Sequence, residues 1–150
     1  MKKILMTICI LAVAVYTAGC NKYIEAEKNG TIYYGAYNRR DMIHADVKLF
    51  QANSDTFCDG IIFINAPSRA ITMKNDLVDA RMHLTCSDGK LIASTLKFKK
   101  GSFDNLQGEG FDQLNNKYKF REIPKSEFKE LSEKTKVKFI NDSNSSIIKY

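Results

Sequence analysis

The side chains best suited to chemistry are those of two histidines, His44 and His83, and of four cysteines, of which Cys58 and Cys86 lie in the body of the chain. A zinc site needs three or four such ligands at short, regular spacings. The sequence contains no His-x-His, His-Glu-x-x-His or Cys-x-x-Cys segment. On an extended strand His83 and Cys86 point to opposite faces, which argues against a shared metal ion. We therefore expect no metal site and no cofactor.

Three other side chains are candidates for acid–base chemistry: His83, Glu109 and Asp112. Paired carboxylates cleave glycosidic bonds, and an imidazole can act as a general base. For such chemistry in this chain, the sequence offers only the closeness of Glu109 and Asp112. The chain has no Gly-x-Ser-x-Gly nucleophile elbow, and a lone Gly-x-Gly is no phosphate loop. We expect no catalytic residue, with a hydrolase or enzyme inhibitor using a cleft around these three residues as the alternative.

The N-terminal segment is typical of an export signal. Lys2 and Lys3 precede an apolar run over residues 4–18, and no acidic residue appears before Glu25. The run is shorter than the roughly 20 residues that a helix needs to cross a bilayer. A charged start, a short apolar centre and a small-residue end indicate a secretory signal peptide, with a short anchor helix as the alternative.

The end of this segment has a special junction. Ala18 and Gly19 are followed at once by Cys20 and then by the polar Asn21. This junction resembles the lipobox of bacterial lipoproteins, and the resemblance covers residues 1–21. It implies cleavage before Cys20, attachment of palmitate-type lipid to this cysteine, and anchoring in the cell envelope; two or three acyl chains hold a protein on a membrane without a spanning helix. By the family's sorting rule, Asn21 favours the outer membrane if the cell is Gram-negative.

Two cysteines remain after this processing, because Cys9 leaves with the signal peptide and Cys20 is used by the lipid. In an oxidising compartment such as the periplasm, two thiols most often form a disulfide. A Cys58–Cys86 bond would close a loop of about 28 residues and contribute about 3 kcal/mol. Two buried free thiols, or a Cys–His catalytic pair, are the alternatives.

Composition limits the partners. Residues 20–150 are long enough for one domain with a real core. The whole chain has a formal net charge of +6, and loss of Lys2 and Lys3 leaves about +4. Small lysine groups, at 97–100, 117–119 and 134–138, are interpreted as solvated faces, with anionic lipid headgroups or lipopolysaccharide as alternatives. We expect the membrane and another envelope protein or component as partners, and no nucleic acid.

The elements that would position these residues are mostly strands. Alternating apolar and polar residues, separated by turn signals, predict strands over 31–37, 42–50, 56–58, 61–64, 78–86, 91–98, 103–111 and 117–123. Residues 20–29 lack a strong period and are interpreted as a lipidated tether to a single domain over 30–150. Residues 125–136 are rich in helix formers, and 137–140 is a further strand candidate. The fold class is mainly β, an antiparallel meander forming a small barrel or sandwich, with one short C-terminal surface helix.

Two segments resemble each other within this pattern. Cys58 is followed by Asp59 and Gly60, a strong signal for a two-residue hairpin turn. Cys86 precedes a similar turn at 88–89. We therefore expect two like hairpins whose packing brings Cys58 and Cys86 within bonding distance.

Three functions remain for such a domain. The first is a membrane-anchored envelope lipoprotein whose β domain is a binding or structural module with an exposed apolar patch. The second is the hydrolase or inhibitor, whose cleft requires its three side chains to converge. The third is a carrier of a hydrophobic ligand, which requires a barrel with an open apolar interior.

Overall fold

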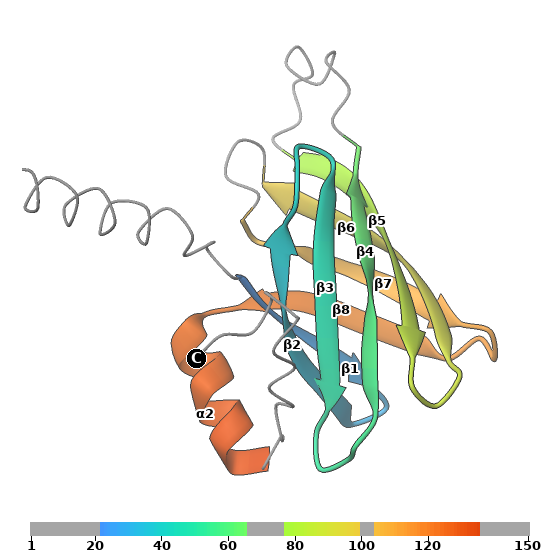
Figure 1. Cartoon of the computed structure of the whole chain (residues 1–150), viewed down its shortest axis with the longest axis vertical. Coiled ribbons are helices and arrows are strands. Elements are labelled where there is room, and N and C mark those ends of the chain that lie inside the picture. The colour runs from blue at the N-terminus through green and yellow to red at the C-terminus, as the bar shows by residue number, and fades with distance from the viewer. Residues whose placement is uncertain (1–21, 66–76, 100–103, 136–150) are drawn as a thin grey trace, which may run out of the picture.

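The computed structural model describes residues 22–65, 77–99 and 104–135. Within them, eight antiparallel strands close into a barrel in sequence order, with β1 pairing with β8 (Figure 1). The strands are β1 Lys22–Lys28, β2 Thr31–Arg39, β3 His44–Gln51, β4 Phe57–Ile64, β5 Leu77–Cys86, β6 Leu91–Lys99, β7 Gln107–Asp112 and β8 Lys117–Ile123, and helix α2 Lys125–Thr135 follows. The prediction of a mainly β fold with a short helix after the strands is confirmed, and the barrel is the form that it takes.

Several predictions lie outside the described residues. They are the signal peptide, the lipid attachment at Cys20, the start of the strand predicted over 103–111, and the strand candidate over 137–140. In the part of the chain that the structure describes, no helix is both long and apolar enough to cross a bilayer.

The strands are held by a strict alternation of inward and outward side chains. In β5 every second residue from Val78 to Cys86 is buried, and the residues between them are exposed. The same alternation runs through β6. Inward side chains from seven of the eight strands, β7 excepted, form one core together with Leu106, which precedes β7. The largest members that are less than 2% exposed are Tyr118, Phe98, Ile24, Leu49, Ile62, Met82, Leu84, Leu96 and Leu106. Burying each such side chain contributes about 1.5–3 kcal/mol.

The predicted tether is wrong. Residues 22–28 form β1, which pairs with β2 on one side and β8 on the other. Its inward residues Ile24 and Ala26 belong to the core. The outward Glu25 accepts a hydrogen bond from Arg121 at 2.9 Å, so a charged residue on this short strand has a partner on β8.

The predicted hairpin turn at Asp59-Gly60 is also wrong, because both residues lie within β4. Gly60 lies opposite Leu84 of β5, and a Cβ at Gly60 would lie 1.8 Å from the carbonyl oxygen of His83. The glycine is therefore required by the close approach of two strands rather than by a turn. By contrast, Gly89 sits in the turn after β5 with a φ of +87°, which favours glycine. The two segments are not like hairpins.

The two ends of the barrel differ, and we name them by their connections. The "turn end" carries the β1–β2, β3–β4, β5–β6 and β7–β8 turns. The "loop end" carries the β2–β3 loop, the start of β1 and the end of β8, together with the strand ends at Ile64, Leu77, Lys99 and Gln107. Figure 1 shows the turns toward the bottom and lower right, and the β2–β3 loop at the top.

Helix α2 packs on the outside of the barrel, beside β1 and β2 (Figure 1). Its Phe128 is 1% exposed and forms a second, smaller core with Tyr34, Phe50 and Ile123. The ring of Phe128 stacks on Tyr23 with 4.4 Å between centroids. The helix predicted over 125–136 thus exists, and one outer face of the barrel is covered by it.

Candidate functional site

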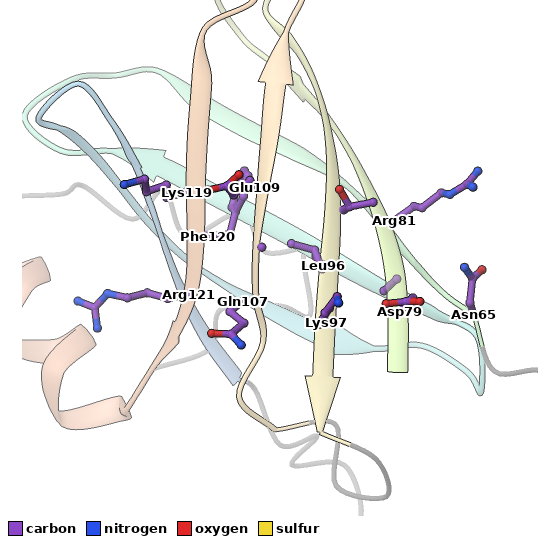
Figure 2. A pocket seen from close by; sticks show the side chains of 13 residues that line it. Asn65, Asp79, Arg81, Leu96, Lys97, Gln107, Glu109, Lys119, Phe120 and Arg121 are labelled. Carbon is purple, nitrogen blue, oxygen red and sulfur yellow. The ribbon is translucent and has the colours of Figure 1, made fainter. Parts of the chain in front are cut away.

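A hollow of about 820 Å³ lies on the outer surface of β5, β6, β7 and β8. A strongly twisted sheet is saddle-shaped, so its outer surface is concave along one direction. Two rows of outward side chains run across the four strands and line this hollow; Figure 2 shows them projecting from the strands. The rows are Asp79, Lys97, Gln107 and Arg121, and Arg81, Thr95, Glu109 and Lys119.

The lining has more positive than negative charge. Glu109 is paired with Lys117, whose Nζ lies 2.8 Å from Oε1. Asp79 lies directly opposite Lys97 across the β5–β6 pair, where opposite charges attract. Among the residues that the structure describes, Arg81 has no ion pair with a carboxylate, and Lys119 lies directly opposite Glu109 of β7 and Glu27 of β1 without forming one. The hollow therefore presents a positive potential, and such a surface attracts anions.

Arg121, at the edge of the hollow, has a structural task. Its guanidinium donates to Glu25 of β1 at 2.9 Å and to Glu127 of α2 at 2.6 Å. These hydrogen bonds, the one to Glu25 first, hold the pKa of Arg121 above its ordinary value. The residue stays charged and links β8 to β1 and to α2. The cations of the hollow that are left for a ligand are therefore Arg81, Lys97 and Lys119.

The structure does not bring His83, Glu109 and Asp112 together. Glu109 lines the hollow. His83 is exposed on the outer face of β5, where its ring meets Phe63 edge-on at 6.2 Å. Asp112 points into the barrel and is 6% exposed. The cleft that acid–base chemistry by these three residues would require is absent from the described part of the chain.

Asp112 instead caps the turn after β7. Its Oδ1 accepts hydrogen bonds from the backbone N–H groups of Leu114 and Asn116, both at 2.9 Å, and its Oδ2 accepts one from the Tyr118 hydroxyl at 3.2 Å. Burial raises the pKa of Asp112, but the hydrogen bonds from Asn116, Leu114 and Tyr118 outweigh it and hold the pKa below its usual range. The carboxylate is thus a charged structural group at the turn end.

The other histidine also has a local role. Nδ1 of His44 lies 2.8 Å from Oδ2 of Asp41, in the β2–β3 loop, and its ring meets Phe63 at 5.3 Å. Within the described ranges, no cluster of three or more histidine, cysteine or acidic side chains is placed to hold a metal ion.

The predicted disulfide is confirmed. Cys58 and Cys86 are bonded directly across the β4–β5 pair, with 3.8 Å between their Cα atoms. The backbone N–H of Ser87 donates to the carbonyl of Phe57, which makes the cysteines a non-hydrogen-bonded pair, the position where cross-strand side chains come closest. Both cysteines face the core. Their bond is therefore part of the barrel's framework at the turn end.

The comparisons with known proteins say little beyond the fold. No protein-family model matches the chain, and no curated protein matches it. Among solved structures, the chain is similar to a de novo designed fluorescence-activating β-barrel, with a TM-score of 0.48 and 16% identity, over 73% of this chain and 94% of that one.

The interior of this barrel is filled. A carrier of hydrophobic ligands needs an open apolar space, yet Tyr118 and Phe98 project inward and are each 1% exposed. Tyr33 and Tyr37 add two further large inward side chains, with ring centroids 6.0 Å from Tyr118 and 6.1 Å from Phe98. The room that the carrier alternative requires is taken by these side chains.

Exposed apolar side chains occur at both ends of the barrel. At the loop end, Met42 is 76% exposed, Ile43 46% and Leu77 49%. At the turn end, Leu91 and Leu114 are 55% and 75% exposed. The alternation over 42–50 predicts that Ile43 lies on the buried face of a strand, but β3 begins one residue later, at His44.

Sequence reasoning missed the residues that form the hollow. It grouped the lysines by their neighbours in sequence and interpreted Lys97 and Lys119 as solvated faces. The available signal was their position: both are outward residues of predicted strands. Their convergence depends on β6 and β8 both pairing with β7. The predicted antiparallel meander implies that order, but the alternation within single strands does not give the register that aligns these outward residues.

Proposed function

We propose that the chain is a lipid-anchored lipoprotein of the cell envelope, and that its barrel is a non-enzymatic module that binds an anionic partner in the hollow on β5–β8. The excess of cations there, from Arg81, Lys97 and Lys119, carries the binding half of the proposal. The lipobox resemblance at Cys20 supports the anchor, and Asn21 favours the outer membrane of a Gram-negative cell.

The chemistry of the hollow suggests the kind of partner. Ammonium and guanidinium groups donate charge-assisted hydrogen bonds to phosphate and carboxylate oxygens. The side chains stand on paired strands, whose register sets the spacing of their Cα atoms. We infer that an envelope component bearing phosphate or carboxylate groups places one such group between Lys97 and Lys119. Because the hollow is open to solvent, binding is expected to weaken as salt rises.

The anchor is tested by the intact mass of protein extracted from the membrane fraction. We expect the mass of residues 20–150 plus acylated glycerol, and we expect Cys20→Ala to release the chain from the membrane fraction. An unprocessed or unlipidated chain in the membrane fraction would remove this half of the proposal.

The binding half is tested by isothermal titration of the detergent-solubilised lipoprotein with pyrophosphate as the anionic probe. We expect the double variant Lys97→Gln/Lys119→Gln to bind about tenfold more weakly, the loss of about 1.4 kcal/mol from charge-assisted hydrogen bonds. The control is Lys125→Gln/Lys129→Gln, which removes the same charge from exposed positions of α2. Equal weakening in both variants would mean that net charge, and not the hollow, holds the anion.

A further inference from the structure

We propose that the loop end of the barrel rests on the membrane, with the β2–β3 loop, residues 40–43, inserted between the lipid headgroups and the acyl chains. The occupant of this surface is a lipid bilayer. The inference rests on the anchor of the proposed function and adds which end of the barrel, and which side chains, meet the lipid.

The distance from the anchor sets the orientation. Only Asn21 separates Cys20 from Lys22, the first residue of β1. Two residues of fully extended chain span at most about 7 Å. The acylated cysteine must therefore lie close to the start of β1, and that start is at the loop end. A barrel tied so closely turns this end toward the bilayer.

The loop end also presents the apolar side chains that a bilayer favours. Met42 is 76% exposed at the β2–β3 loop, Ile43 beside it is 46% exposed, and Leu77 at the start of β5 is 49% exposed. In water these side chains leave apolar surface uncovered, and transfer out of water stabilises them by about 25 cal/mol for each Å² removed. Figure 1 shows the β2–β3 loop at the top of the barrel, beside the end of β4 and the start of β5.

The backbone of this loop is largely satisfied by its own residues. The Arg39 guanidinium donates to the carbonyls of Asp41 and Met42, at 2.9 and 3.0 Å. Oδ1 of Asp41 accepts hydrogen bonds from the N–H groups of Ile43 and His44, both at 2.8 Å. Burying a backbone polar group costs free energy unless it is hydrogen-bonded. These backbone groups can therefore keep their hydrogen bonds when the loop tip moves out of water.

Basic side chains stand behind the apolar tip. Arg39 ends β2, and Arg40 in the loop is paired with Asp46. Lys99 is exposed at the end of β6, directly opposite Leu77. Long basic side chains lie along an interface with their charge among the headgroups while their neighbours enter the apolar layer. The loop end thus combines an apolar tip with basic side chains around it, of which Arg40 already has a carboxylate partner in Asp46.

The experiment uses the fact that the chain contains no tryptophan. Processed lipoprotein carrying Met42→Trp is reconstituted into vesicles of phosphatidylethanolamine and phosphatidylglycerol, with and without brominated acyl chains that quench tryptophan. The matched control is Leu114→Trp at the turn end, since Leu114 is 75% exposed and Met42 is 76% exposed. We expect brominated lipid to reduce Met42→Trp emission by about half, because interfacial insertion reaches about 5–10 Å, and to leave Leu114→Trp unchanged. Leu77→Trp reports on the same end if Met42→Trp does not fold.

The possible outcomes distinguish a failure of this inference from a failure of the proposed lipid anchor. A chain that remains in solution and fails to sediment with vesicles overturns the anchor and the inference together. A chain that sediments but whose Met42→Trp and Leu77→Trp emission resists quenching overturns the inference alone. Equal quenching of Met42→Trp and Leu114→Trp, or quenching of Leu114→Trp only, also overturns it, because the loop end is then not the end that meets the lipid.

Discussion

At the turn end of the barrel, a disulfide and a fully buried carboxylate hold neighbouring strands together, whereas at the loop end the charged groups form ion pairs that are open to solvent. The turn end has the Cys58–Cys86 bond and the Asp112 carboxylate with its three hydrogen-bonded neighbours. Among the described residues of the loop end, the comparable group is Glu122, which is only partly buried and accepts from the Tyr37 hydroxyl at 2.8 Å. The difference teaches that the most deeply buried bonds between strands lie at the turn end, so changes there are expected to cost the most stability.

The largest effect is expected from the disulfide. The double variant Cys58→Ala/Cys86→Ala should lower the free energy of unfolding by about 3 kcal/mol, because the bond closes a long loop in the unfolded chain. Urea unfolding followed by circular dichroism measures it. A loss below about 1 kcal/mol would contradict the comparison of the two ends, because the disulfide would then contribute little to the free energy of unfolding.

The next effect is expected at Asp112. Near neutral pH, Asp112→Asn should cost about 1–3 kcal/mol, because buried donors lose a charged acceptor. The folded-state pKa of Asp112 is lowered, so its contribution is present above the unfolded pKa of about 3.9 and is lost as pH falls through the folded pKa.

The pH dependence distinguishes this carboxylate from a neutral cap. Urea unfolding at several pH values should show the gap between wild type and Asp112→Asn shrinking as pH falls below about 4. A gap that stays constant over this range would mean that the charge of Asp112 does not stabilise the turn end.

A smaller effect is expected at Glu122, the corresponding group at the loop end. It accepts hydrogen bonds from the Tyr37 hydroxyl and, at 3.2 Å, from the backbone N–H of Leu106, and it lies 3.7 Å from Lys22 Nζ. Because Glu122 is only partly buried, Glu122→Gln should cost about 1 kcal/mol in thermal or urea unfolding. If Glu122→Gln costs more than Asp112→Asn, the ranking of the two ends is reversed.

The smallest effect on stability is expected at the loop tip. Met42→Ser should change the free energy of unfolding in detergent by less than about 0.5 kcal/mol, because Met42 is largely exposed. The contrasting control is Leu49→Ser, at a buried position of the core. It should cost several times more free energy of unfolding, since it buries a hydroxyl among apolar side chains. A loss above about 1 kcal/mol for Met42→Ser would place the loop tip in the packed structure of the barrel.

Much of the barrel follows from local patterns in the sequence. The strict alternation from Val78 to Cys86 predicts both a strand and its buried face, and the same holds for 117–123. The helix after Pro124 follows from its composition. The disulfide follows from counting the cysteines that remain once Cys9 and Cys20 are assigned to the predicted signal peptide and lipid anchor, so no knowledge of strand pairing was needed to reach it.

The failures share a physical cause, which is that the deciding contact lies far away in the sequence. An Asp-Gly pair is equally suited to a turn and to a crowded strand, and the carbonyl of His83 on the neighbouring strand decides between them at Gly60. Likewise, β1 is short and charged, and its outward Glu25 is stabilised only by Arg121. The hollow is a third example, because its lining side chains come together only when β5, β6, β7 and β8 are paired.

The pairing of β1 with β8 has a consequence for how the chain folds. Glu25 and Arg121 are partners across the barrel's closing seam, yet they are 96 residues apart in the sequence. The other strand pairs join neighbours and can form as the chain is made, but the edge of β1 that faces β8 stays unpaired until residues 117–123 arrive. Contacts of such long range are slow to form, and an open strand edge is a site where other chains can add. Closing this seam is therefore the step at which the nascent barrel is most exposed to aggregation.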